Sequence, residues 1–134
     1  MFHMSTSYPP DYQLSDVGWN INRVGSYFGV FVSAFAMTLG IEVPLLCLIM
    51  RKRASMTRII VTGIVANACT LPFVWFVFPM WLEGFGYVLV SEVYAVVVEF
   101  LFIKSVLRVD SGSAILGSFL MNLSSFLVGL IVFG

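Results

Sequence analysis

The sequence predicts an all-α integral membrane protein, a four-helix bundle made of two tandem helical hairpins. Three observations lead to this fold class. Of the 134 residues, 60% are hydrophobic and only 10% are charged, whereas soluble domains carry about 25% charged residues. Four long apolar runs account for the excess, and each has the roughly 20 residues that a membrane-spanning helix needs. The connections between them are short, so consecutive helices must be antiparallel neighbours.

The chain divides into a polar N-terminal leader and a transmembrane domain. The leader covers residues 1–23 and lacks the basic segment and short apolar stretch of a cleavable signal peptide. The domain covers residues 24–134, and its spans are predicted at 24–50, 59–80, 85–107 and 114–133. The first run is longer than a bilayer requires, so we expect it to tilt, kink or extend beyond the hydrocarbon. Continuous rather than alternating apolar runs exclude a β-barrel.

The distribution of Lys and Arg predicts the orientation. Six of the seven basic residues lie in or beside the first and third connections, and only Arg23 lies on the opposite side. By the positive-inside rule, both termini are outside and both basic connections are cytoplasmic. We interpret the basic residues of the first connection as topogenic or lipid-facing; they are Arg51, Lys52, Arg53 and Arg58. The plasma membrane of a prokaryote is the expected location.

Composition also narrows the partners. Seven basic residues balance seven acidic ones, which excludes a basic nucleic-acid binder. Cys47 and Cys69 lie inside apolar runs, and the one histidine is in the leader, so no zinc or haem motif is present and no cofactor is expected. The expected partners are the lipid bilayer and either further copies of the chain or the subunits of a larger membrane complex. Small residues spaced by four, as in Gly25-x-x-x-Gly29, favour such close helix contacts.

Two glutamates and two asparagines are predicted to share one depth in the membrane. Glu42, Asn67, Glu99 and Asn122 each lie nine residues from the nearest basic connection. At 1.5 Å per residue this is about 13 Å, close to the middle of a hydrocarbon core about 30 Å thick. Carboxyls at that depth are costly, and they usually face the bundle interior and mark function. Glu92, seven residues before Glu99, adds a third acid on nearly the same helix stripe.

Two prolines lie near this layer. Pro44 and Pro72 are predicted to kink their helices, because proline cannot donate to the carbonyl four residues earlier. That leaves the carbonyls of Gly40 and Ala68 free. Free carbonyls beside carboxylates are groups that a desolvated cation would coordinate.

The two hairpins resemble each other, which predicts an internal repeat. Glu42 is followed 25 residues later by Asn67, and Glu99 is followed 23 residues later by Asn122. Both asparagines begin the pattern Asn-x-x-Thr/Ser-Leu/Phe. Each hairpin contains two spans, so the repeats would share one orientation, as in transporters built from parallel repeats.

Four readings of the polar layer are open. The leading hypothesis is a transporter-like or channel-like protein that handles a proton or small cation. The main alternative is a non-catalytic structural or assembly subunit of a larger membrane complex, in which protonated glutamic acids hydrogen-bond asparagine amides and hold helices together. A hard-metal site with oxygen ligands is the third reading, with no metal identified. Catalysis is the fourth, but no nucleophile–base pair supports an enzyme, and no catalytic residue is assigned.

Several motifs together also resemble a known type of protein. They are Ile41-Glu42-Val43-Pro44, Asn67-x-x-Thr70-x-Pro72-x-x-Trp75, Glu92 with Glu99, and Asn122-x-x-Ser125-Phe126-x-x-Gly129. The combination resembles small four-span prokaryotic membrane proteins of uncharacterised function, over about residues 36–130. That resemblance implies a four-helix bundle and no particular activity.

Overall fold

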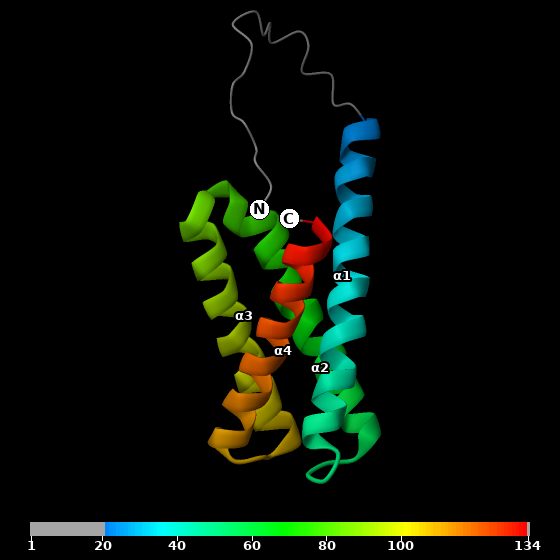
Figure 1. Ribbon diagram of the computed structural model, residues 1–134, viewed down its shortest axis with the longest axis vertical. Helices are drawn as coiled ribbons and strands as arrows, with labels where there is room; N and C mark the ends of the chain where they lie inside the picture. The colour runs from blue at the N-terminus through cyan, green and yellow to red at the C-terminus, as the bar shows by residue number, and fades with distance from the viewer. Residues whose placement is uncertain (1–20, 134) are drawn as a thin grey trace, which may run out of the picture.

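Four long helices form one bundle in the computed structural model, which describes residues 21–133, with side chains for residues 25–132 (Figure 1). The helices are α1 (Ile21–Met50), α2 (Met56–Pro72), α3 (Gly84–Leu107) and α4 (Ser111–Phe133). A π-helical segment, η2 (Phe73–Val77), and a 3-10 turn, η3 (Phe78–Met80), continue α2. All four stretches are long and apolar enough to cross a membrane. The predicted all-α four-helix membrane bundle is therefore confirmed, while residues 1–20 of the predicted leader lie outside the described residues.

All four helices begin earlier than the predicted spans, α3 by one residue and the other three by three residues, because the first turns of those three are polar. α1 begins at Ile21, α2 at Met56 and α4 at Ser111, each three residues before the predicted start. At α4, an Asp110 carboxylate oxygen accepts the backbone N–H of Ser113 at 2.8 Å. This satisfies one of the donors that a helix N-terminus leaves free. Hydropathy marks only the apolar part of a helix, so a polar first turn is assigned to the preceding connection.

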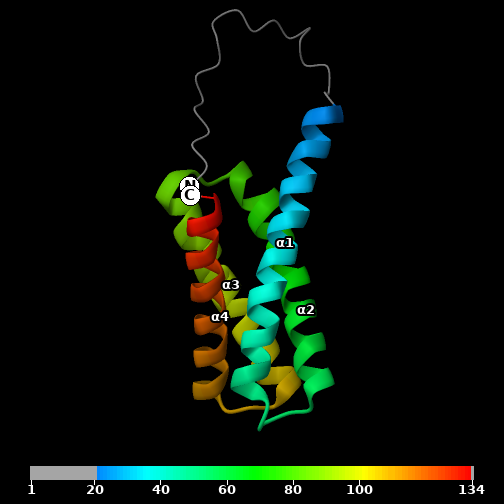
Figure 2. The ribbon, with the colours of Figure 1, turned by 45° about the vertical axis from the view of Figure 1, so that its right-hand side comes forward.

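Each helix packs against two neighbours, and contact between α1 and α4 closes the bundle. Figure 2 shows both basic connections, 51–55 and 108–110, at one end, which we call the basic side. The opposite end, with residues 21 and 133, is the terminal side. The half of the bundle toward the basic side holds the apolar core, which consists of Leu46, Met50, Ile59, Ile103, Leu107, Ala114 and Met121.

Polar contacts tie the two hairpins together on the basic side. Arg53 forms an ion pair with Asp110, and both side chains are exposed. Arg58 donates to the carbonyl of Val106 at 2.8 Å. Two of the four residues interpreted as topogenic or lipid-facing thus also contact the second hairpin, whereas Arg51 and Lys52 are simply exposed.

The terminal end of α2 is shaped by proline. Pro79 has no N–H, so the carbonyls of Val74 and Trp75, five and four residues earlier, lose their helical donors. The hydroxyl of Tyr87 donates to the Val74 carbonyl at 3.0 Å. The hydroxyl of Tyr27 donates to the Trp75 carbonyl at 2.8 Å. Two tyrosines from neighbouring helices therefore stabilise the irregular segment η2.

Candidate functional site

The four polar residues predicted at one depth form two buried pairs. Asn67 on α2 donates its side-chain amide to a carboxylate oxygen of Glu42 on α1, at 2.9 Å. Asn122 on α4 donates in the same way to Glu99 on α3, at 2.5 Å. Both glutamates are 1% exposed. Each hairpin thus supplies a carboxyl from its first helix and the amide that binds it from its second.

The asparagines are held in place by their own helices. Besides its glutamate, Asn67 donates to the carbonyl of Gly63 at 3.1 Å. Asn122 likewise donates to the carbonyl of Ser118 at 3.0 Å. Both acceptors lie one helical turn before the asparagine, and an amide group has two N–H donors to share between carbonyl and carboxylate. The two amides are therefore fixed in orientation by the backbone before they meet the carboxyls.

A serine links the two hairpins at the same layer. The hydroxyl of Ser125 on α4 donates to the second carboxylate oxygen of Glu42, at 2.5 Å. The residue in the matching place on α2, Thr70, instead donates to the carbonyls of Ala66 and Asn67 in its own helix. Both oxygens of Glu42 are thus occupied, whereas Glu99 has one oxygen without a hydrogen-bond partner among the described residues.

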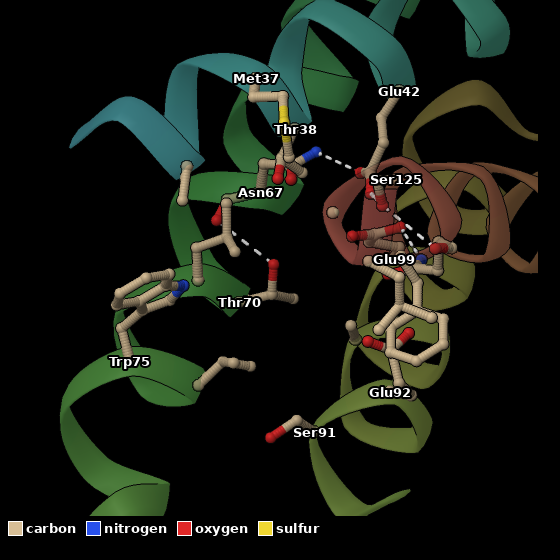
Figure 3. Close-up of a pocket in the computed structure, with 18 residues that line it drawn as sticks. Met37, Thr38, Glu42, Asn67, Thr70, Trp75, Ser91, Glu92, Glu99 and Ser125 are labelled. Atoms are coloured by element: carbon tan, nitrogen blue, oxygen red, sulfur yellow. Dashed lines mark hydrogen bonds between the residues drawn. The ribbon is translucent and has the colours of Figure 1, made fainter. Parts of the chain in front are cut away.

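A cavity of about 230 Å³ lies directly on the terminal side of this layer. All four helices contribute to its wall, and Glu42, Asn67, Glu99 and Asn122 are among the lining residues. Figure 3 shows Glu42, Asn67 and Glu99 around this space. Among the described residues that line the cavity, none carries a positive charge. The cavity therefore holds three carboxyls, because Glu92 also lines it, and no compensating cationic side chain.

Glu92 and its neighbour Ser91 lie further toward the terminal side than Glu99 (Figure 3). Glu92 is half-buried. Ser91 is 5% exposed, and its hydroxyl has no hydrogen-bond partner among the described residues. A buried hydroxyl without a partner costs free energy, and such groups are few in folded proteins.

The prolines predicted to act beside the layer lie away from the cavity. α1 remains helical through Pro44, which is exposed, as is Gly40. Pro72 is the last residue of α2 and precedes η2. Neither proline lines the cavity, nor do Gly40 and Ala68. The carbonyls freed by Pro44 and Pro72 are thus not cavity ligands in this structure, and the irregular backbone of the bundle is instead at η2.

The arrangement does not resemble a metal centre. Among the described residues, no group of three or more His, Cys, Asp or Glu side chains could hold a metal ion. The three carboxyls of the cavity are spread along α1 and α3, and two of them are already engaged by amides. The hard-metal reading of the polar layer therefore has no support in this part of the chain.

Buried positions recur at constant spacing in the two hairpins. From Gly25 on, where side chains are described, every buried residue of α1 has a buried counterpart 57 residues later in α3. The pairs are Ala34 and Ser91, Glu42 and Glu99, Leu46 and Ile103, and Met50 and Leu107. From α2 to α4 the spacing is 55 residues, and it pairs Ile59 with Ala114, Thr62 with Gly117, Gly63 with Ser118, Ala66 with Met121, and Asn67 with Asn122.

The sequence did not single out Ser91 or the contact from Ser125 to Glu42. Ser91 lies eight residues before Glu99, a spacing that places both on one helix stripe and could have drawn attention to it. Ser125 was part of a motif, but its acceptor lies 83 residues away, on a helix that is not its neighbour in sequence.

Comparisons with protein-family models, with curated proteins and with solved structures found no match to the chain. The resemblance to small four-span prokaryotic membrane proteins stays a prediction.

Proposed function

We propose that the protein is a transporter-like or channel-like membrane protein that handles protons or a small cation at the Glu42–Glu99 layer. One observation carries the proposal: two buried carboxyls face a cavity that is lined by three acids and by no cationic side chain. Uncompensated carboxylates in such surroundings are costly, so protons or cations must balance them. Exchange of those ions with the aqueous phase is the transport step that we infer.

Flux through liposomes tests this proposal. The purified protein is reconstituted with a pH-sensitive dye or a sodium indicator inside, and a potassium diffusion potential drives entry of the ion. We expect flux above that of protein-free liposomes, and a loss of about 100-fold or more in Glu42→Gln and Glu99→Gln, because a positioned proton-transferring group contributes about 10²–10⁴-fold. Glutamine keeps an oxygen that accepts from asparagine, so the bundle is retained and only the titratable group is lost.

Glu83 offers a matched control. It is an exposed glutamate in the connection before α3, outside the cavity, so Glu83→Gln should conduct like the wild type. Wild-type flux at the level of empty liposomes, or flux that survives the double change Glu42→Gln/Glu99→Gln, would contradict the proposal. Circular dichroism and size-exclusion profiles show that each variant is folded.

A structural or assembly subunit is the second candidate, and a different surface favours it. Gly25, Gly29, Ser33, Ala36 and Gly40 of α1 are all exposed. A Cβ atom built on any of the three glycines would meet nothing within 4 Å. Such spacing lets another helix approach closely. If flux is absent and the Glu→Gln changes instead lower the yield of a native complex, this candidate replaces the first.

We further propose that the two hairpins are repeats of one unit, inserted with both termini outside in a prokaryotic plasma membrane. The recurrence of buried positions at spacings of 57 and 55 residues supports the repeat. The basic residues gathered at one end support the orientation. We expect the many exposed apolar side chains to contact lipid.

A further inference from the structure

Hydrogen-bond acceptors without partners gather on one wall of the cavity. Among the described residues, the carboxyl of Glu92 makes no hydrogen bond, and one carboxyl oxygen of Glu99 accepts none. The buried hydroxyl of Ser91 also has no hydrogen-bond partner there. All three belong to α3 and line the cavity. We call Ser91, Glu92 and Glu99 the α3 acceptors.

The facing wall is apolar. It is formed where α2 gives way to η2, by Leu71, Val74 and Trp75, which we call the apolar wall. In Figure 3, Trp75 lies across the cavity from Glu92 and Glu99. The cavity therefore has two unlike sides, one with carboxyl and hydroxyl groups that can accept hydrogen bonds, and one that offers an aromatic ring and aliphatic groups.

The contrast between the two walls narrows the class of cation that could bind in the cavity. A bare metal ion needs several oxygen ligands that converge on one point, and no group of three or more His, Cys, Asp or Glu among the described residues could hold one. Binding of a proton alone needs no cavity of about 230 Å³, because that volume has room for several water molecules. A cation with its own N–H donors and an apolar body satisfies both walls.

We propose that this cavity binds a small monovalent organic ammonium ion, with its nitrogen against the α3 acceptors and its body against the apolar wall. The inference rests on the proposed function, because it names the class of cation that the same layer of carboxyls would handle. The ammonium supplies the donor that the Ser91 hydroxyl lacks and the positive charge that the lining lacks. The ring of Trp75 can add a cation–π contact, since Trp has the most favourable ring for it.

Binding of benzylammonium to the detergent-solubilised protein tests the proposal without any measurement of transport. Trp75 becomes the sole tryptophan in a Trp19→Phe/Trp81→Phe background, so its fluorescence reports on the cavity directly. We expect a saturable change with Kd of about 1 mM or below, in keeping with a ligand of few atoms. Benzyl alcohol, which matches benzylammonium in shape but has no charge, should give no saturable change.

Variants locate the site. Glu92→Gln should weaken benzylammonium binding at least about tenfold, because a hydrogen bond to a charged group contributes about 1.5–3 kcal/mol. Ser91→Ala should weaken it about threefold to tenfold, because one hydrogen bond from the ammonium is lost while the carboxyl of Glu92 is kept. Glu83→Gln, outside the cavity, should bind like the parent protein. Folding of each variant is checked by circular dichroism in the same detergent.

The outcomes separate this inference from the proposed function. Absence of saturable binding in the folded parent, equal binding of benzyl alcohol, or unchanged affinity in both Glu92→Gln and Ser91→Ala would each overturn the ammonium site. Proton or sodium flux that depends on Glu42 and Glu99, without benzylammonium binding, would leave the proposed function standing alone. Benzylammonium binding without any flux would support the site and contradict the proposed function.

Discussion

Glu42 and Glu99 are chemically alike but differ in how they are held. Both oxygens of Glu42 accept hydrogen bonds, one from Asn67 and one from Ser125. Glu99 receives only the amide of Asn122. A carboxyl with every oxygen engaged is suited to holding helices together, whereas one with a free oxygen can bind something else. We therefore expect Glu99 to be the more sensitive of the two in any ligand-binding assay.

A pH dependence is expected from Asp110, outside the membrane spans. The backbone N–H and then the hydroxyl of Ser113 donate to its carboxylate, and Arg53 lies beside it, so its pKa falls to about 2 from an ordinary value of 3.8. Because the folded pKa is lowered, the unfolded chain takes up the proton first as pH falls. The stabilisation is complete above about pH 5 and disappears as pH falls through about 2.

Thermal unfolding in a non-ionic detergent checks this. The melting temperature of the wild type should exceed that of Asp110→Ala by a constant amount from neutral pH to about pH 5, and the difference should vanish near pH 2. Asp110→Asn keeps a side-chain oxygen for Ser113 but cannot titrate, so its melting temperature should vary less with pH. A difference that persists unchanged to pH 2 would contradict the assigned role.

The sequence could predict the height of each polar residue and that the midplane carboxyls face the bundle interior, but not which side chains meet there. Counting residues from the basic connections placed Glu42, Asn67, Glu99 and Asn122 at one depth, and the structure brings them together in pairs. The contact of Ser125 with Glu42 depends on how α4 is rotated against α1, which is set by packing of the whole bundle. Residue counts carry no information on that rotation.

At the scale of the helix, glycine sets how closely α2 approaches α1. A Cβ atom built on Gly63 would lie 3.1 Å from Cγ2 of Val43 and 3.5 Å from Cδ2 of Leu46. Val43 is β-branched and has one strongly preferred rotamer in a helix, so it cannot move aside easily. Gly40, on the exposed face of α1, would meet nothing within 4 Å.

These two glycines give a matched comparison. Gly63→Ala should lose about 1–3 kcal/mol to overpacking, against a gain of about 1 kcal/mol in helix propensity. Gly40→Ala has only the gain. We expect Gly63→Ala to be the less stable variant by at least about 1 kcal/mol, as measured by unfolding in mixed detergent and dodecyl sulfate micelles. Equal stabilities would show that α1 and α2 are not in close contact at Gly63.

Helix bounds illustrate what hydropathy can and cannot predict. The ends of α1 and α3 agree with the predicted ends at residues 50 and 107, because basic residues follow them closely. The starts of α2 and α4 lie in polar turns and were placed three residues late. The irregular segment η2 was not predicted. Pro79 leaves two of its carbonyls without a helical donor, and the tyrosines of α1 and α3 that donate to them are brought there only by the tertiary fold.

At the scale of the molecule, the two halves of the bundle differ in what they hold. The basic side is closed by the apolar core and by the contacts of Arg53 and Arg58 with the second hairpin. The terminal side holds the cavity. An ion that reaches Glu99 from the terminal side would meet packed apolar side chains beyond it. Passage to the basic side therefore requires a rearrangement between the hairpins rather than a continuous open pore.

Orientation can be tested on the intact chain. A fusion of alkaline phosphatase after Gly134 should be active in a bacterial host, because this enzyme folds only outside the cytoplasm, and a green fluorescent protein fusion at the same place should be dark. The reverse pattern is expected for fusions after Val109, in the second basic connection. Replacing Arg51, Lys52 and Arg53 together by Asn should reduce this asymmetry. Fluorescence of the Gly134 fusion in the unaltered chain would show that the orientation is opposite to the predicted one.

The pairing of each glutamate with the asparagine of its own hairpin has a consequence for synthesis of the protein. The first hairpin can leave the ribosome and enter lipid with Glu42 already bound by Asn67, so the carboxyl of Glu42 has a hydrogen-bond partner before the second hairpin is made. The second hairpin brings Glu99 with Asn122 in the same way. The second partner of Glu42, the hydroxyl of Ser125, follows 83 residues later in the chain. Biogenesis can thus proceed as insertion of two hairpins, each with its midplane glutamate already bound to an asparagine, followed by their docking in the order in which the chain is translated.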